Sequence, residues 1–377
     1  MTLRVVQVNC VIDDQGRQPE TLLKAWPTLP AVAAAAARAG ANVTVLQASR
    51  VVAEHRRDGV TYRFVPEPRL RKGSGAGILP WRLAAAVRRE APDIVHFNGL
   101  DFPFHARAVS SLGLPMLVQD HASRPDARIG RLRRWGYEKI AAVAFTSSAQ
   151  AQPFLSRRQL PAGAHVFAIP ECSSSFTPGE REQARRETGV FGDPALLWVG
   201  HFDTNKDPLT ILHATRKALQ QLPNLQLWCA FVGTQLLPDV EELLRTDQAL
   251  STHVHLLGRV PHHRIETLCQ ASDFFLLGSR REGSGYALIE ALACGVTPIV
   301  SDIPPFSALT GAGSVGALVP VGNSDAFAGW IVALAARPRE ALRLDVVNHF
   351  ERHLSFSVVG TRLEAAYRAI AADSAGL

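Results

Sequence analysis

The sequence predicts an α/β protein built from two doubly wound, parallel-sheet domains of the Rossmann-like type. The chain has 377 residues, more than one compact hydrophobic core usually holds. Short β-branched or aromatic segments alternate with segments of helical periodicity, the pattern of strands joined by crossover helices. A polar, turn-rich stretch interrupts the alternation once, and the pattern then restarts. We therefore expect one domain in residues 1–175 and a second in residues 176–350.

The first domain is expected to contain strands that alternate with helices. The strand-like segments are residues 4–9, 43–47, 62–65, 94–97, 116–119, 142–146 and 166–169. The helix-like segments are residues 30–39, 81–90, 103–112, 129–140 and 149–158. Several of the strand-like segments are continuous apolar runs, which is typical of a parallel sheet covered by helices on both faces.

The second domain is expected to follow a linker in residues 171–186, where three consecutive serines precede a proline and a glycine. Its strands are predicted at residues 196–199, 227–232, 254–257, 274–277, 298–301 and 317–319. Its helices are predicted at residues 208–221, 239–246, 263–271, 285–293 and 325–336. Residues 351–377 are expected to form a C-terminal helix, because apolar side chains share one helical face. Crossing back to the N-terminal domain is a candidate arrangement for it.

The composition indicates a globular protein and excludes several other classes. Hydrophobic residues make up 47% of the chain, charged residues 20%, and the mean hydropathy is +0.04. The first ten residues do not form the apolar core of a signal peptide, so we expect a cytoplasmic protein. No apolar run has the length of a membrane span. The five cysteines are odd in number and scattered, which predicts neither a disulfide framework nor a zinc site.

Positive charge is concentrated in the first half. Residues 1–177 contain 23 Lys and Arg against 13 Asp and Glu, a balance of +10, and the remaining 17 and 21 give −4. A solvated surface, a surface for an anionic membrane or lipid phosphate, and a nucleic-acid surface are the alternatives. No nucleic-acid-binding motif accompanies the charge, so no nucleic-acid partner is expected. The candidates for the acceptor or membrane side are Arg128, Arg131, Arg133 and Arg134.

The most informative stretch is residues 279–295, SRREGSGYALIEALACG, where a predicted strand ends, a glycine-rich loop turns and a helix begins. Free backbone N–H groups at a helix N-terminus favour anions, and glycines let the backbone approach a ligand closely. Glu282 lies in the loop and Glu290 about one and a half turns into the helix, so the two carboxylates can contact different parts of one elongated ligand. The pattern predicts a phosphate-bearing ligand at the carboxyl edge of the sheet.

A second stretch, residues 198–208 with the sequence WVGHFDTNKDP, follows the first strand of the second domain. Lys206 brings a cation to the same edge of the sheet. Together the two stretches resemble glycosyltransferase family 4 of the GT-B fold, in which two Rossmann-like domains face each other across a cleft. In that family a strand–Gly–Arg–four residues–Lys segment holds the diphosphate of a nucleotide sugar. A pair of glutamates separated by seven intervening residues holds the sugar and the ribose.

The resemblance implies a role for particular residues of this chain. Lys206 matches the family lysine, Glu282 and Glu290 match the glutamate pair, and Gly283, Ser284 and Gly285 form the loop. Weaker matches complete the implied site. His121 resembles the strand-end histidine that contacts the donor sugar, and Val260 lies in the segment whose backbone meets the nucleobase.

The chain also departs from the family pattern. His201 occupies the position of the arginine, and Ser284 replaces the usual phenylalanine. The first loop, residues 9–17, lacks the Gly-Gly turn, which leaves Gly16 as the candidate for contact with the donor phosphate. Four histidines could alternatively be metal ligands, but a structural role is favoured for them. They are His253, His255, His262 and His263.

The resemblance implies a retaining glycosyltransferase that moves a hexosyl group from a nucleoside diphosphate sugar to an acceptor hydroxyl. No Asp-x-Asp occurs in the chain, so neither a metal nor another cofactor is expected. The acceptor is unidentified and could be lipid-linked, a glycan or a small molecule, with peripheral contact to an anionic inner membrane face. Two alternatives are a sugar-nucleotide epimerase of the same fold and a non-catalytic nucleotide-sugar-binding module.

Overall fold

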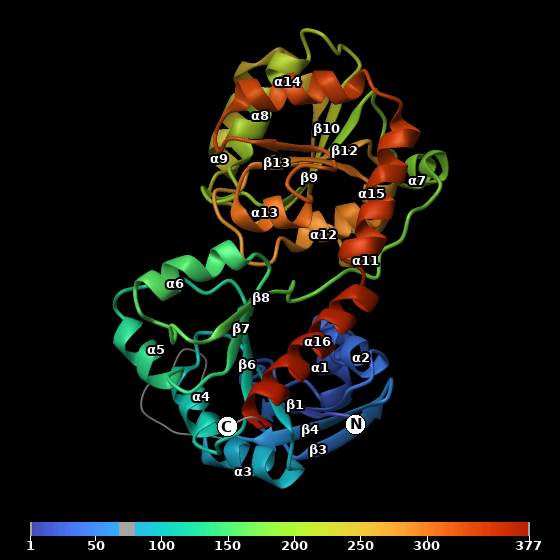
Figure 1. Cartoon of the computed structure of the whole chain (residues 1–377). Helices are drawn as coiled ribbons and strands as arrows, with labels where there is room; N and C mark the ends of the chain where they lie inside the picture. The colour runs from blue at the N-terminus through green and yellow to red at the C-terminus, as the bar shows by residue number, and fades with distance from the viewer. Residues whose placement is uncertain (1, 68–79, 376–377) are drawn as a thin grey trace. The chain divides into compact units, whose positions relative to one another are not determined.

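The computed structural model describes residues 2–67 and 80–375, and these divide into two compact units (Figure 1). The first unit contains Met1–Ser173 and Phe356–Leu377, and the second contains Ser174–Ser355. Each unit has one sheet, and all strand pairs except one are parallel. The predicted fold class, two α/β domains with parallel sheets, is confirmed.

The sheet of the first unit has the strand order β3-β4-β2-β1-β5-β6-β7-β8. The strands are β1 (Arg4–Asn9), β2 (Asn42–Ser49), β3 (Ala53–Arg57), β4 (Val60–Pro66), β5 (Ile94–Asn98), β6 (Met116–Gln119), β7 (Ala142–Phe145) and β8 (His165–Ala168). Strand β3 was not predicted, because its residues are mostly charged. It pairs antiparallel with β4 through a tight turn in which Asp58 and Gly59 both have positive φ, at 53° and 77°.

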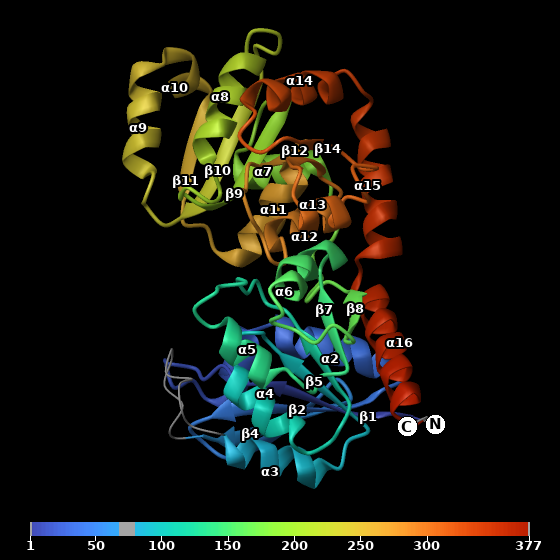
Figure 2. The same cartoon turned by 60° about the vertical axis from the view of Figure 1, so that its left-hand side comes forward.

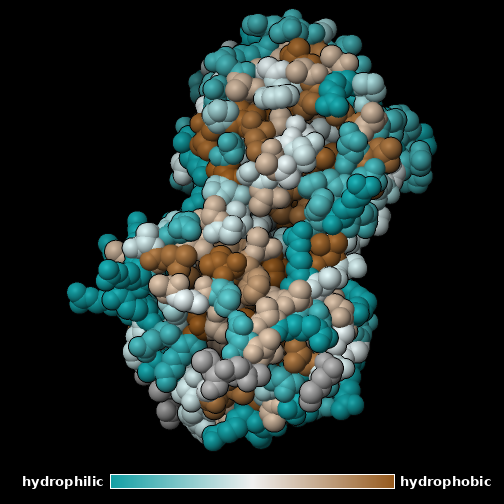
Figure 3. Space-filling view, viewed as in Figure 1, coloured by the Kyte–Doolittle hydropathy of each residue, from teal (hydrophilic) through white to brown (hydrophobic). Residues whose placement is uncertain are grey.

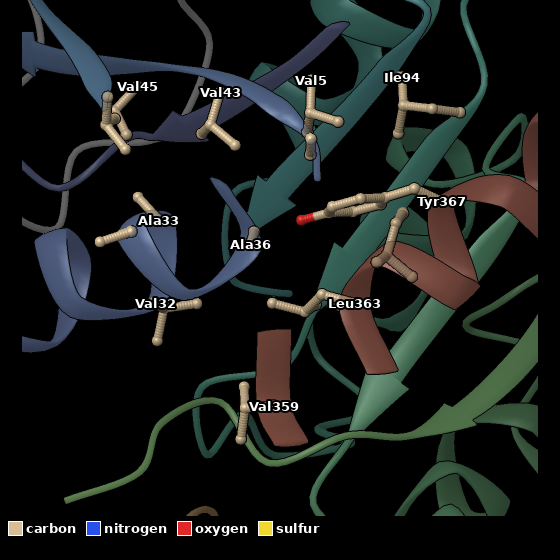
Figure 4. Packing of buried hydrophobic residues seen from close by; sticks show 14 of the residues in the cluster. Val5, Val32, Ala33, Ala36, Val43, Val45, Ile94, Val359, Leu363 and Tyr367 are labelled. Carbon is tan, nitrogen blue, oxygen red and sulfur yellow. The ribbon is translucent and has the colours of Figure 1, made fainter. Parts of the chain in front are cut away.

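Helices cover this sheet, and the last helix of the chain belongs to the same unit. The helices are α1 (Pro19–Ala25), α2 (Thr28–Arg38), α3 (Trp81–Glu90), α4 (Pro103–Ser110), α5 (Gly130–Gly136), α6 (Gln152–Ser156) and α16 (Phe356–Ala375). Leu363 and Tyr367 of α16 point toward Ala36 of α2 and Val5 of β1 (Figure 4). The two helices approach closely at Gly360, where an added Cβ would lie 2.3 Å from the Ala35 carbonyl oxygen. A larger residue at position 360 would therefore force α16 away from the core.

The sheet of the second unit has the order β11-β10-β9-β12-β13-β14. The strands are β9 (Ala195–His201), β10 (Gln226–Val232), β11 (Val254–Gly258), β12 (Phe274–Leu277), β13 (Thr297–Ser301) and β14 (Ala317–Val319). The helices are α7 (Arg181–Thr188), α8 (Pro208–Ala218), α9 (Leu237–Thr246), α10 (Gln248–His253), α11 (His262–Ala271), α12 (Tyr286–Ala293), α13 (Pro304–Leu309), α14 (Ser324–Ala335) and α15 (Arg339–His353). Helix α8 lies beside α14 (Figure 2).

Helix α7 corrects the predicted linker, because it occupies part of residues 171–186. Its sequence is mostly charged, so no apolar periodicity indicated it, and ion pairs help to hold it in place. Arg181 and Arg185 both contact the carboxylate of Asp273, at 2.8 and 3.0 Å. Asp273 is buried and also accepts a hydrogen bond from the backbone N–H of Ala195. These contacts join α7 to the amino ends of β9 and β12.

The strand order of the second unit positions the predicted site. Strands β9 and β12 are neighbours and parallel, so the loops that follow them lie at the same carboxyl edge. The first of these loops carries Lys206 and the second carries Glu282 and the glycines. Two segments 76 residues apart in the sequence are therefore brought together.

Candidate active site

The loops after β9 and β12 are joined by hydrogen bonds. The backbone N–H of Arg280 donates to the Asn205 carbonyl at 2.7 Å, and the Asn205 side-chain amide donates to the Arg281 carbonyl at 3.0 Å. At Gly278 an added Cβ would lie 3.0 Å from the Asp207 carbonyl oxygen. The close approach and the paired hydrogen bonds hold the two loops as one structural element.

Asp207 connects this element to helix α8. It has a left-handed backbone, with φ of 47°, and its carboxylate caps the helix by accepting from the Thr210 N–H at 3.3 Å. The other carboxylate oxygen accepts from Nη2 of Arg280 at 2.7 Å. The backbone N–H of Lys206 donates to the Asp203 side chain at 2.8 Å. The position of Lys206 is thus fixed on both sides.

The side chains of Lys206 and Glu282 form an ion pair between Nζ and Oε1. Their side chains are only 19% and 12% exposed. Charges shielded from water are costly unless each is paired with an opposite charge. The contact therefore stabilises both the ammonium and the carboxylate at the carboxyl edge of the sheet.

The glycine-rich loop ends at Gly285, the residue before α12. Gly285 has a φ of 68°, and an added Cβ would lie 2.8 Å from Leu309 and 3.2 Å from Phe306. A glycine is required there by both conformation and space. Gly283 and Ser284 are partly exposed, so the loop presents little side-chain bulk before the helix begins. Such a helix N-terminus is suited to an anion.

Glu290 lies on α12 and contacts His262, the first residue of α11. His262 Nε2 and Glu290 Oε1 are 2.5 Å apart, and the His262 ring packs on Phe176 with a centroid distance of 5.1 Å. The carboxylate is 12% exposed and the imidazole 65% exposed. Burial raises the pKa of Glu290, and the adjacent His262 partly opposes this effect. His262 was not assigned to this site from the sequence, although it directly follows the segment expected to contact the nucleobase, and that position pointed to the site.

Two other histidines of the second unit, His253 and His255, have structural contacts. His253 contacts the carbonyl oxygens of Ala249 and Pro223, and the ring of His255 stacks on Trp228. Within the residues that the structure describes, no group of three or more His, Cys, Asp or Glu side chains is arranged to hold a metal ion. His201 is exposed at the end of β9, beside Gly233.

The nucleobase candidate also lies at the carboxyl edge of the second unit. Val260 is partly exposed in the connection between β11 and α11. The connection begins at Gly258, which has a φ of 65°. Val260 lies two residues before His262, which contacts Glu290.

In the first unit His121 follows strand β6 and contacts two polar side chains. Its Nδ1 pairs with the carboxylate of Glu171, and its Nε2 lies 3.0 Å from Oδ1 of Asn98. Burial lowers the pKa of His121, but the neighbouring Glu171 and Asp120 carboxylates outweigh burial and raise it overall. Glu171 was not a candidate from the sequence, where it was part of the predicted linker.

The first loop is closed by Asp13. Its carboxylate accepts from the backbone N–H of Arg17 at 2.6 Å and from the Arg17 guanidinium at 2.7 Å. Gly16 is exposed, with a φ of 62° and no atom within 4 Å of an added Cβ. The backbone at Gly16 is therefore accessible, and the loop holds its shape without the Gly-Gly turn.

The expectation that Arg133 faces an acceptor or a membrane was wrong. Arg133 is fully buried, donates to the carbonyls of Leu100 and Arg124, and pairs with Asp101 at 2.7 Å. Its guanidinium thus holds together the segments that follow β5 and β6. Arg128, Arg131 and Arg134 are exposed.

No helix within residues 2–67 and 80–375 combines the length and the apolar composition that crossing a membrane requires. On the face shown in Figure 3, hydrophobic and hydrophilic residues are interspersed.

Comparisons with known proteins agree with this geometry. Residues 31–171 match the family model of Glycosyltransferase Family 4, and residues 180–345 match that of glycosyl transferases group 1. The first match lies within the first unit and the second within the second unit. The chain belongs to glycosyltransferase family 4. The resemblance to family 4 is confirmed, and this protein is a glycosyltransferase of the GT-B type.

Individual relatives of this family 4 glycosyltransferase point the same way. It is 25% identical over 269 residues to the GDP-mannose:cellobiosyl-diphosphopolyprenol alpha-mannosyltransferase of Xanthomonas oryzae pv. oryzae, covering 70% of each chain. It is 28% identical over 345 residues to D-inositol 3-phosphate glycosyltransferase 1 of Catenulispora acidiphila, covering 82% and 81%. Sucrose-phosphate synthase from Thermosynechococcus elongatus shares its fold with a TM-score of 0.72 at 19% identity, covering 98% and 100%. Neither the epimerase nor the binding-module alternative gains support.

Proposed function

We propose that this glycosyltransferase moves a hexosyl group from a nucleoside diphosphate sugar to an acceptor hydroxyl, with retention of anomeric configuration and without a metal ion. The observation that carries the proposal is the shielded ion pair between Lys206 and Glu282 beside the glycine-rich loop. A cation, a carboxylate and a helix N-terminus at one sheet edge provide partners for the diphosphate and for the sugar hydroxyls.

In this proposal the donor replaces the contact between Lys206 and Glu282 with contacts of its own to each side chain. The diphosphate takes Nζ of Lys206 and the backbone amides near Gly283 and Gly285, and the carboxylate of Glu282 accepts hydrogen bonds from sugar hydroxyls. Glu290 accepts hydrogen bonds from the ribose diol, and the backbone at Val260 contacts the nucleobase. His201 replaces the family arginine at the diphosphate, and His121 and Gly16 of the first unit are assigned to the donor sugar and phosphate by resemblance.

The transfer step needs no reactant other than the donor and the acceptor. The bond between the sugar anomeric carbon and the phosphate oxygen breaks, and a bond from the same carbon to the acceptor oxygen forms on the same face. The acceptor proton passes to an oxygen of the departing phosphate, which leaves as the nucleoside diphosphate. Lys206 and the helix N-terminus stabilise the negative charge that develops on this leaving group.

The acceptor is proposed to carry a phosphate group. The names of two relatives specify a diphosphopolyprenol and an inositol 3-phosphate. Residues 1–177 have a balance of +10, and Arg128, Arg131 and Arg134 are exposed. These features suit a phosphate-bearing acceptor and peripheral attachment at the cytoplasmic face of a membrane.

A donor panel tests the proposed function. The purified chain is incubated with GDP-mannose, UDP-glucose, ADP-glucose and other nucleotide sugars, and products are followed by mass spectrometry. Slow release of a nucleoside diphosphate and a free sugar from one donor is expected. An isomerised nucleotide sugar would support an epimerase instead, and binding without turnover, with and without phosphate-bearing acceptors, would support a binding module.

A further inference from the structure

Both ring nitrogens of His121 face hydrogen-bond acceptors. Nδ1 pairs with the carboxylate of Glu171, and Nε2 lies 3.0 Å from Oδ1 of Asn98. The orientation of the Asn98 amide follows from its other contact, because Nδ2 donates to the Val8 carbonyl at 3.3 Å. An imidazole can donate a hydrogen bond to two acceptors at once only when both of its nitrogens carry a proton. The geometry is therefore that of an imidazolium.

The other ionisable groups around His121 are consistent with this charge. Asp120 is its neighbour in the chain and is 7% exposed, and burial raises the pKa of Asp120 to about 6. His96 of β5 is close enough to His121 for a charge on His121 to disfavour protonation of His96. Burial lowers the pKa of His96 to about 3, so this ring is neutral, and its Nδ1 lies 2.7 Å from the Tyr367 hydroxyl. Glu171 is thus the anion that forms an ion pair with His121, and no second cation competes for it from His96.

Glu171 is itself held in place by the strands beneath it. It follows β8 by three residues, and the carbonyl of Ile169 accepts a hydrogen bond from the buried Gln119 side chain at 3.1 Å. The Ile169 N–H also donates to the Phe145 carbonyl at 2.8 Å. Glu171 is only 8% exposed, so its carboxylate interacts with His121 in a setting where screening by water is weak.

We propose that Glu171 is a positioning residue that keeps His121 protonated on both nitrogens, so that His121 contacts the donor only as a hydrogen-bond donor. This step rests on the proposed function, in which His121 binds the donor sugar. A ligand atom at Nε2 takes the place of the Asn98 amide oxygen and must itself be an acceptor, such as a sugar hydroxyl, carboxylate or phosphate oxygen. Residue 171 is the last residue of the family 4 match, and the resemblance assigned no role in the site to Glu171.

The direct test is a titration of His121 in the full chain, followed by NMR of its ring Cε1–H signal, which His121→Gln assigns by removing it. In Glu171→Gln the midpoint is expected to move to lower pH by about one pH unit or more, because the neighbouring charge is lost. Glu171→Asp keeps the charge and should move the midpoint less. Glu138→Gln is the matched control, since Glu138 is an exposed carboxylate of the same unit that pairs with Arg107. A midpoint that is the same in wild type and Glu171→Gln would overturn the proposal.

Activity supplies a second readout. Wild-type kcat/KM for the donor should fall as pH rises through the His121 midpoint, and the fall should occur at lower pH in Glu171→Gln. A shifted titration with an unchanged pH profile would overturn the role toward the donor. If the wild-type chain turns over no nucleotide sugar, the proposed function fails, whereas the titration still decides whether Glu171 sets the protonation of His121.

Discussion

Nζ of Lys206 contacts the carboxylate of Glu282, although the two residues lie in loops that follow different strands. Each side chain is largely shielded from solvent. The family resemblance gives the two residues different ligands, a diphosphate and a sugar. In the structure the two side chains bind each other, so under the proposed function a donor competes with this contact.

His262→Gln should weaken donor binding without preventing catalysis. The substitution removes a contact of 2.5 Å that orients the Glu290 carboxylate, while a neutral amide keeps part of the hydrogen bonding. We expect KM for the nucleotide sugar to rise roughly 3- to 10-fold with little change in kcat. His263→Gln is the matched control, because His263 is the exposed neighbour on the same helix. Equal effects of the two variants in steady-state kinetics would contradict the role of His262.

Gly285→Ala should destabilise the second unit. The substitution combines a left-handed backbone with a Cβ that would lie 2.8 Å from Leu309. Gly189→Ala is the control, because Gly189 has a φ of 75° but no atom within 4 Å of an added Cβ. The control should cost about 1 kcal/mol of unfolding free energy, and Gly285→Ala about 1–3 kcal/mol more. Denaturant unfolding measures both, and indistinguishable midpoints would refute the steric argument.

Transfer activity should be unaffected by EDTA. The chain contains no Asp-x-Asp, and in the proposed function Lys206 and the N-terminus of α12 take the place of a metal ion. The rate of nucleoside diphosphate release is measured before and after treatment with about 5 mM chelator. This excess removes weakly bound divalent ions. Loss of activity that Mn²⁺ or Mg²⁺ restores would show that the proposal is mistaken on this point.

The exposed arginines should govern any binding to anionic membranes. Replacing Arg128, Arg131 and Arg134 with Ala should reduce co-sedimentation with anionic liposomes at low salt, since each exposed cation adds about 1 kcal/mol of attraction. Binding by the wild type should disappear near 0.5 M salt, roughly where screening shortens the Debye length below 5 Å. Arg133→Ala instead removes a buried cation and should lower thermal stability. Equal, negligible binding of wild type and triple variant would favour a solvated surface beside a soluble acceptor.

Much of the fold could be predicted, because the buried strands are apolar runs in the sequence. β6, β12 and β13 are entirely buried, and their sequences are continuous or nearly continuous hydrophobic segments. Elements that rely on charge were missed. β3 is a charged edge strand, and α7 is fixed by the pairing of its arginines with Asp273. The pairing partners of these elements lie far away in the sequence, so a local sequence pattern could not indicate them.

From the sequence, the site could be located only at one edge of the sheet of the second unit. The motifs placed Lys206 and Glu282 at the same edge because parallel strands end together. The contact between His262 and Glu290 and the contact between His121 and Glu171 depend on tertiary positions that spacing does not encode. Arg133 was misjudged because arginine is rarely fully buried, and its four hydrogen-bond partners lie 9 to 33 residues away in the sequence.

The most direct test of the central claim compares Glu282→Gln and Lys206→Met in two measurements, calorimetric binding of the nucleoside diphosphate and transfer from the nucleotide sugar. Glu282→Gln should keep or improve nucleoside diphosphate binding, because Lys206 loses its competing carboxylate, and should lower transfer by at least about 100-fold. Lys206→Met should weaken both. Wild-type transfer in Glu282→Gln, or an equal loss of nucleoside diphosphate binding in the two variants, would contradict the assignment of Lys206 to the diphosphate and Glu282 to the sugar.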